Sequence, residues 1–484
     1  MSPALLFSFV VAYFVILLIV AWYTGRNSNN ESFFIGNRNS NWMLVAFGMI
    51  GTSLSGVTFV SVPGAVGRDA FTYFQITLGY LIGYLTIAYV LIPLFYRLQL
   101  TSIYNYLNTR FGKASYKTGA SFFILSRTLG ATARLFLVVR ILQETILQTF
   151  GVPFIVTTLI ILVMILVYTY EGGVKTIVYT DTLQTTCMLA GLIICVGYIL
   201  HTMNLSFGES ITAMGERGLT RIFETDPNSK LFFVKQIVAG AFITITMTGL
   251  DQEMMQKNIS VTTMRDSQKN VVSLGFIMLV VIGLFLFLGG LLHLYGAQVG
   301  VTATGDKLFP ELALHHMPPV ISVIFIIALI SALFPSADGA MTALTSSFCI
   351  DILGIQRRPD WDAAKQKKVR QRVHLTMAFI FLVFVMVFEW INNQSMIGVI
   401  LKIAAYTYGP LLGLFTFGIF TKRVVNDKLV PVVCVIAPLL CLVVDNNQAF
   451  LFGKFQIGLE LLVINGFFTY MGLLLISRPA DSRA

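Results

Sequence analysis

The tetrapeptide Pro335-Ser336-Ala337-Asp338 lies in the middle of an apolar run from Val320 to Ile350, and it decides the class of fold. A helix needs about 20 predominantly apolar residues to cross a bilayer, so this run is long enough to span one. A carboxylate at the bilayer centre costs at least ~2.5 kcal/mol, and hydroxyls, carbonyls or a cation must satisfy it. The tetrapeptide therefore predicts a membrane helix with a polar site at mid-depth.

A second acidic residue, Asp181, lies in another apolar run among four hydroxyl side chains. These are Thr180, Thr182, Thr185 and Thr186. Two acidic residues within the membrane, each among hydroxyl groups, could form a cation site. The cation bound there could be a metal ion or a proton. The other interpretation is a polar patch that hydrogen-bonds two helices together.

The composition agrees with a membrane protein. Hydrophobic residues make up 56% of the 484-residue chain and charged residues 12%, whereas soluble domains carry about 25% charged residues. We therefore expect an all-α polytopic membrane protein. The net charge of +10 is assigned to cytoplasmic loops and not to nucleic-acid binding.

About thirteen segments are long and apolar enough to span the bilayer, and the first is taken as a membrane helix, not a cleaved signal. They are Leu5–Tyr23, Trp42–Val66, Phe71–Leu98, Gly119–Thr149, Phe154–Tyr168, Ile177–His201, Leu231–Met255, Val271–Tyr295, Val320–Ile350, Val373–Trp390, Met396–Phe420, Val430–Val444 and Phe455–Ile476.

Basic residues recur in every second loop, and the strongest run is Arg357 to Arg372. Lys257, Arg265 and Lys269 are assigned to one of these loops. Since cytoplasmic loops carry the excess of Lys and Arg, this pattern predicts that the N-terminus is outside and the C-terminus is cytoplasmic.

Two segments carry signals for an interruption. The second contains Gly51-Thr52-Ser53-Leu54-Ser55-Gly56, a poor continuous helix, and an opened backbone in lipid is tolerated only where it lines a cavity. Close helix packing through small residues is the alternative. Pro335 is the other candidate break, because proline removes one backbone hydrogen bond; a simple kink is the alternative.

The fourth segment carries Arg127 and Arg134, seven residues apart and so on one helix face. Either could bind a substrate carboxylate or satisfy Asp181, Asp338 or loose carbonyls. Arg140 and Glu144, four residues apart, can pair with each other. The candidates for a substrate cavity are Ser53, Ser55, Thr58, Tyr73, Gln75, Arg127, Arg134 and Gln252.

Asp251-Gln252-Glu253 closes the seventh segment and could line a substrate path or cap a helix end. The chain has no phosphate-binding GxxxxGK[ST] loop and no HExxH motif, so nothing marks an ATP-driven pump or an enzyme.

Taken in order, several stretches resemble the sodium:solute symporter family, which includes bacterial proline, galactose and sialic-acid carriers. The resemblance covers roughly Glu31 to Phe420. Its marks are Ser32 through Arg38, Tyr168 through Gly173, Tyr179-Thr180-Asp181, Asp251 through Lys257, Ser336 through Asp351 and Gly409 through Phe415.

The resemblance implies a LeuT-type fold, in which five helices and the following five form an inverted repeat. The implied parts are a peripheral helix and loop over 1–40, a transport core over 41–425 and two peripheral helices with a short tail over 426–484. The repeats would cover about 41–203 and 230–421.

The resemblance also implies a main sodium site formed by carbonyls of Gly51, Leu54 and Ala332 and the hydroxyl of Ser336. The family usually has two adjacent hydroxyl residues there, and Pro335 replaces the first. Some relatives bind a second sodium with an aspartate that matches Asp181 and serines at positions held here by Asp338 and Gly339.

The expected function is sodium-coupled import of a small polar solute, such as a sugar, a sialic acid or an amino or organic acid, across a bacterial-type plasma membrane. One or more sodium ions would be coupled, with a proton as the alternative ion. A monomer in the lipid bilayer is expected to suffice. The competing hypothesis is a transporter-like sensor or uncoupled channel.

Overall fold

The structure is a computed structural model that describes residues 3–25, 40–358, 360–391 and 396–479, without the side chains of 3, 25, 171–175 and 396–397. The stretch from Ser32 to Arg38 that contributed to the family resemblance lies outside the described residues.

The described residues are almost entirely helical. The helices are α1 Pro3–Gly25, α3 Trp42–Ser53, α4 Gly56–Asp69, α5 Tyr73–Thr86, α6 Ile92–Arg97, α7 Asn105–Arg110, α8 Lys113–Leu142, α9 Phe154–Met203, α10 Phe207–Glu216, α11 Phe233–Thr244, α12 Gln252–Ile259, α13 Met264–Val299, α14 Leu308–Glu311, α15 Pro319–Ser347, α16 Ala363–Ile391, α17 Met396–Thr407, α18 Gly409–Phe420, α19 Val430–Asn446, α20 Gln448–Phe452 and α21 Leu461–Leu475. Two short strands, β1 Val424–Val425 and β2 Ser477–Arg478, pair antiparallel.

Each predicted segment largely coincides with a helix, part of a helix or a bent helix pair of the structure. Among the described residues, eight helices are long and apolar enough to cross a membrane, and three bent helix pairs also qualify. Two shorter apolar helices, Phe154–Tyr170 and Leu461–Leu475, match the remaining segments. The fifth and sixth segments are the two parts of α9, which is helical from Phe154 to Met203. The chain is a multi-span, all-helical membrane protein.

The predicted interruption of the second segment is confirmed. α3 and α4 meet at an angle of 56°, and the backbone leaves the helical region at Leu54 (φ −96°, ψ 93°) and Ser55 (φ −79°, ψ 170°). Carbonyls at such a break are no longer committed to the helical ladder. This opened backbone is buried, as the absence of water in lipid requires.

The predicted interruption at Pro335 is wrong. α15 runs without a gap from Pro319 to Ser347, with Pro335 inside it. One missing hydrogen bond does not outweigh the packing of a helix that is buried on all sides from Phe325 to Ser347 except at Ile327.

A second break lies at Asp251-Gln252-Glu253, where we expected the seventh segment to close. α11, extended by a π-helical turn over Ile245–Gly249, meets α12 at 65°. Asp251 caps α12 by accepting hydrogen bonds from the backbone N–H groups of Glu253 (2.9 Å) and Met254 (3.3 Å). The capping alternative for this acidic group is therefore confirmed.

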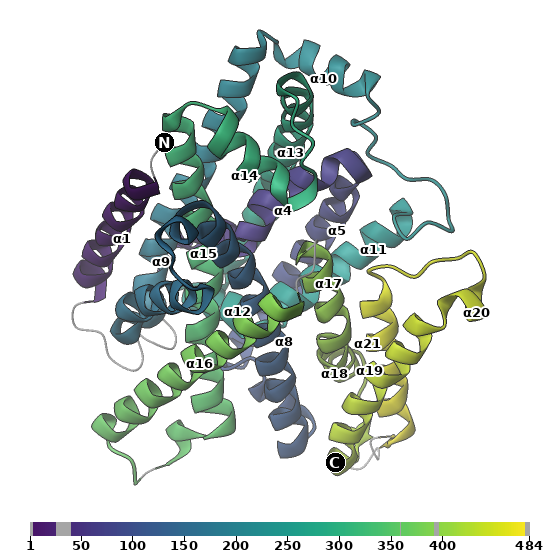
Figure 1. Cartoon of the computed structure of the whole chain (residues 1–484). Helices are drawn as coiled ribbons and strands as arrows, with labels where there is room; N and C mark the ends of the chain where they lie inside the picture. Colours follow the sequence, from purple (N-terminus) through teal and green to yellow (C-terminus); the bar gives the residue numbers. More distant parts are fainter. Residues whose placement is uncertain (1–2, 26–39, 359, 392–395, 480–484) are drawn as a thin grey trace.

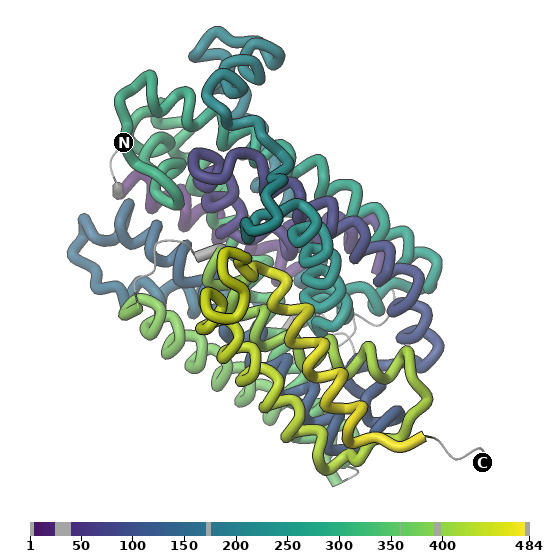
Figure 2. Tube along the Cα trace, turned by 90° about the vertical axis from the view of Figure 1, so that its right-hand side faces the viewer, coloured from purple at the N-terminus to yellow at the C-terminus, as the bar shows by residue number. Residues whose placement is uncertain are grey.

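The buried helix α15 lies at the centre of the molecule and packs against α9, α8 and the broken pair α3–α4. The chain ends lie on the outside, with α1 against α9 and α15, and α19–α21 on the opposite flank (Figure 1). In Figure 2, where the right-hand side of Figure 1 faces the viewer, the same C-terminal helices run across the front of the molecule. The α3–α4 pair and α12, which follows the second break described above, both pack against the central helix α15.

Glycine permits one especially close crossing, between α5 and α11. A Cβ on Gly79 would lie 2.8 Å from the Ala241 backbone nitrogen and 2.9 Å from the Gly240 Cα. Because backbone atoms cannot move aside, we expect Gly79→Ala to destabilise the protein by about 1–3 kcal/mol, as overpacking does. The thermal-unfolding midpoint in detergent checks this. Gly197→Ala is the matched control, since no atom lies within 4 Å of its Cβ position, and an equal effect of both variants would contradict the prediction.

Candidate functional site

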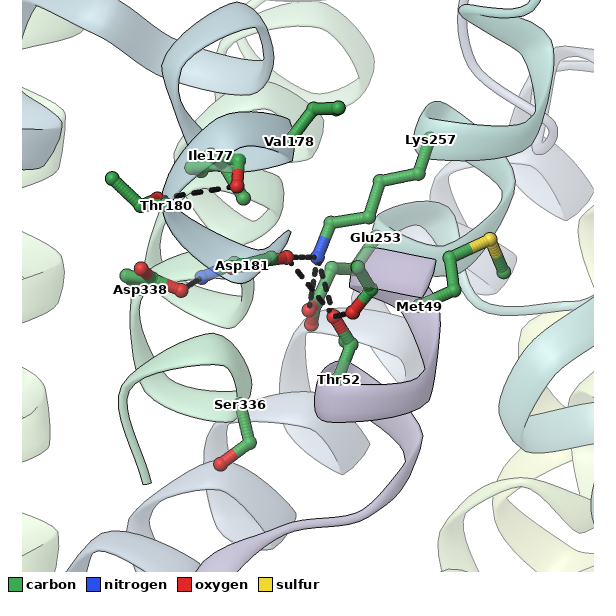
Figure 3. Close-up of polar contacts among 12 residues, drawn as sticks. Met49, Thr52, Ile177, Val178, Thr180, Asp181, Glu253, Lys257, Ser336 and Asp338 are labelled. Atoms are coloured by element: carbon green, nitrogen blue, oxygen red, sulfur yellow. Dashed lines mark hydrogen bonds and ion pairs between the residues drawn. The ribbon is translucent and has the colours of Figure 1, made fainter. Parts of the chain in front are cut away.

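A lysine lies at the centre of the candidate cation site. The Lys257 Nζ atom is 2.7 Å from Asp181 Oδ2 and donates a hydrogen bond to the Thr52 hydroxyl at 2.7 Å. It is also 3.6 Å from Glu253 Oε1 (Figure 3). The Lys257 side chain is 3% exposed, so this ammonium is held by oxygen atoms from α3, α9 and α12 without access to water.

The local structure of α12 delivers this lysine. The sharp bend after α11 turns α12 toward the core, and the Asp251 cap fixes where α12 begins. Glu253 and Lys257 are four residues apart and therefore lie on one face of the helix. A Lys inside a buried helix needs an acidic partner, and Asp181 on α9 supplies it.

Arg127 on α8 is held by acidic groups of the same break. Its guanidinium is paired with Glu253 and lies 3.9 Å from Asp251 Oδ2. The Tyr408 hydroxyl, at the bend between α17 and α18, donates to Asp251 Oδ2 at 2.8 Å. Arg127 thus forms its ion pair with Glu253, just after the α11–α12 break, and not with Asp181 or Asp338.

Asp338 is buried on α15 directly before Gly339, whose Cβ position lies 3.2 Å from Lys257 Nζ. It accepts hydrogen bonds from the Tyr168 hydroxyl (2.6 Å) and from the Gly339 backbone N–H (2.5 Å). Figure 3 shows Asp338 and Asp181 on neighbouring helices. The two intramembrane acids are thus brought into one region, but each has its own hydrogen-bond partners.

The four residues implied for the main sodium site lie where α3 and α4 meet α15. A Cβ on Gly51 would lie 3.4 Å from Pro335 Cγ, so the two helices touch at this point. Leu54 and Ala332 are buried, and the buried Ser336 hydroxyl donates to the Leu333 carbonyl of its own helix at 2.8 Å. That bond leaves the lone pairs of the hydroxyl oxygen free to bind a cation.

A cavity of about 100 Å³ opens beside the α3–α4 break. Six of the predicted substrate residues line it, namely Ser53, Ser55, Thr58, Tyr73, Arg127 and Arg134. The structure does not bring Gln75 and Gln252 to this cavity. The amide of Gln75 bonds to the Leu231 carbonyl (3.1 Å), and that of Gln252 to the Thr101 carbonyl (3.0 Å).

Arg134 differs from Arg127 in its surroundings. It is half-buried, it lines the cavity, and it has no ion pair within the described part of the chain. The predicted Arg140–Glu144 pair forms six residues farther along the chain, where α8 ends, at 2.9 Å. Arg134 is therefore a positive charge presented to whatever fills the cavity.

Sequence reasoning missed the role of Lys257. We counted it among the basic residues of a loop, whereas it is buried and paired with Asp181. The signal that could have revealed it is the Glu253/Lys257 spacing directly after an apolar segment, since paired charges at four-residue spacing are typical of a helix that continues. Thr52 and Tyr168, which contact the two intramembrane acids, were also missed.

Comparisons with known proteins agree with this architecture. A sequence profile described as "Sodium:solute symporter family" matches residues 33–428. The sodium/sialic acid symporter SiaT of Proteus mirabilis is 24% identical over 87% of this chain and 84% of its own length. The sodium/sialic acid symporter NanT of Aliivibrio fischeri is also 24% identical, over 95% and 91%.

A solved structure described as the substrate-bound outward-open state of a Na⁺-coupled sialic acid symporter superposes with a TM-score of 0.83. It is 19% identical in sequence, and the match covers 98% of this chain and 99% of that one. This similarity confirms the LeuT-type fold. The chain therefore belongs to the sodium:solute symporter family, and it is a sodium-coupled solute symporter and not an enzyme.

Proposed function

We propose that this protein imports a small polar solute that carries a carboxylate, with sodium as the co-transported ion, by alternating access. The observation that carries the proposal is Arg134, which lines the cavity and has no ion pair among the described residues. A guanidinium offers a fork of donors that matches a carboxylate. Arg127, in contrast, is already paired with Glu253.

The rest of the cavity suits hydroxylated solutes. Ser53, Ser55, Thr58 and Tyr73 present hydroxyl groups around the same space as Arg134. Hydroxyls both donate and accept hydrogen bonds, as sugar hydroxyls require. Two relatives are named sialic acid symporters, so an acidic sugar is the first substrate class to test.

The test is uptake into proteoliposomes under an inward sodium gradient, with choline replacing sodium as the control. Labelled sialic acid, short carboxylic acids and neutral sugars are compared. We expect sodium-dependent uptake of an acid and little uptake of neutral sugars. Sodium-dependent uptake confined to neutral solutes would contradict the assignment of Arg134, and uptake without sodium dependence would favour an uncoupled channel.

We place the co-transported sodium at the carbonyls of Gly51, Leu54 and Ala332 and the hydroxyl of Ser336. Carbonyl and hydroxyl oxygens suit a hard cation, and the opened backbone at the α3–α4 break supplies such carbonyls next to α15.

Replacing Ser336 with alanine should raise the sodium concentration for half-maximal uptake by at least about tenfold, because an interaction with a charge contributes roughly 1.5–3 kcal/mol. The sodium dependence of initial uptake rates measures this. Ser322→Ala is the matched control, since Ser322 is buried on the same helix and donates to the Ala313 carbonyl at 2.8 Å. Unchanged sodium dependence in the Ser336 variant would remove this residue from the site.

For the topology, we propose an inverted repeat over about 41–203 and 230–421 in the plasma membrane, with the N-terminus outside and the C-terminus cytoplasmic. The support is the alternation of basic residues at the ends of the spans, which persists without Lys257, because Arg265 and Lys269 lie in the first turns of α13.

A further inference from the structure

The position of Lys257 coincides with a place where a second sodium ion was expected. The family resemblance implies a second ion near Asp181, with side chains at positions 338 and 339 completing the site. In this chain the Lys257 ammonium lies 2.7 Å from Asp181 Oδ2, between that carboxylate and the Glu253 carboxylate (Figure 3). A monovalent cation is therefore already present beside Asp181, and it belongs to the protein.

Position 339 is shaped to leave room for this lysine. A Cβ on Gly339 would lie 3.2 Å from Lys257 Nζ and 2.9 Å from the carboxyl carbon of Glu253. A serine here would have to displace the Lys257–Glu253 pair. The glycine on α15 and the lysine on α12 are thus two parts of one arrangement.

The oxygen atoms around the ammonium would suit a metal cation if the lysine were absent. Asp181 Oδ2 and the Thr52 hydroxyl both contact Nζ, and Glu253 Oε1 lies 3.6 Å away. Asp181 Oδ1 and the Thr185 hydroxyl, one turn apart on α9, are buried without a hydrogen-bond partner among the described residues. Carboxylate and hydroxyl oxygens are ligands that hard cations prefer.

We propose that the Lys257 ammonium is a built-in cation that occupies the second ion site between Asp181 and Glu253, so that the protein binds one sodium ion and not two. The inference rests on the proposed function only for the first ion, which is placed near Ser336. Lys257 is then a residue that sets ion stoichiometry, since it excludes sodium by charge and by volume.

The test counts bound ²²Na⁺ per purified protein in detergent, at saturating sodium and without any solute. We expect one ion for the wild type and two for Lys257→Met, which removes the charge and, because methionine is one atom shorter, also frees the position held by Nζ. Lys257→Arg is the matched control that keeps the charge, and it should bind one ion. Two ions on the wild type, or one ion on a folded Lys257→Met variant, would overturn the proposal.

One further variant keeps the test decisive if Lys257→Met does not fold. Asp181→Asn should still bind one sodium, because Asp181 serves the lysine and not the ion; loss of the bound ion would overturn the inference. Where Lys257→Met folds, Ser336→Ala is added to the wild type and to Lys257→Met, and in both it should weaken the first site alone. If the wild type without Ser336→Ala binds no ion while Lys257→Met binds one, the proposed first site is wrong and the role of Lys257 is supported.

Discussion

Replacing Arg134 with glutamine should raise the half-saturating concentration of an acidic solute by about 10- to 150-fold. That range corresponds to the roughly 1.5–3 kcal/mol of a charge-assisted hydrogen bond. The Arg134 guanidinium faces the cavity without an ion pair in the described chain, so its loss strands no buried carboxylate. We therefore expect the thermal-unfolding midpoint to stay near that of the wild type.

The measurement is the solute dependence of uptake in proteoliposomes, with Arg134→Lys as the charge-retaining control. Lysine keeps the charge but loses the fork of donors, so its effect should be intermediate. Normal affinity for the acid in Arg134→Gln would make this arginine structural.

Replacing Arg127 with glutamine should lower the stability of the protein, unlike the Arg134 variant, which should change affinity alone. Its guanidinium is 4% exposed and pairs with Glu253 beside Asp251. Removing one partner of a buried pair costs about 3–5 kcal/mol, because the other charge is left uncompensated. A lower thermal-unfolding midpoint and a lower yield of folded protein in detergent would show it.

The double variant Arg127→Gln/Glu253→Gln distinguishes a charge effect from a packing effect. It removes both charges of the pair, so we expect it to recover much of the lost stability. A double variant as unstable as the single one would mean that Arg127 acts by packing alone. A single variant of full stability would contradict the importance of the pair.

The pattern of spans could be predicted from the sequence because each segment is long and apolar. Such a segment can be recognised without knowing which helices pack against it. The α3–α4 break followed from Gly51 through Gly56, where local composition opposes a helix. The proline at 335 misled us, because the dense packing around α15 keeps that helix continuous. Predictions from local sequence were therefore correct where the packing of neighbouring helices did not override them.

The lysine site could not be predicted in the same way. Hydropathy placed the end of the seventh segment at Met255, so Lys257 was assigned to a loop. Its partner Asp181 is 76 residues away in sequence and lies on α9, and only the 65° bend before α12 brings the two charges together. A contact that depends on the angle between two helices cannot be recognised from the periodicity of apolar residues in the sequence.

The ammonium of Lys257 also bears on how far this carrier can concentrate its solute. A cation that is covalently attached returns with the empty protein and adds nothing to the net charge moved per cycle. One sodium ion with one monoanion then makes transport electroneutral, whereas a second sodium would draw about 2.3 kcal/mol per 100 mV from the membrane potential. Accumulation would be limited to the sodium concentration ratio, about tenfold for each 1.4 kcal/mol, and would persist in a depolarised cell.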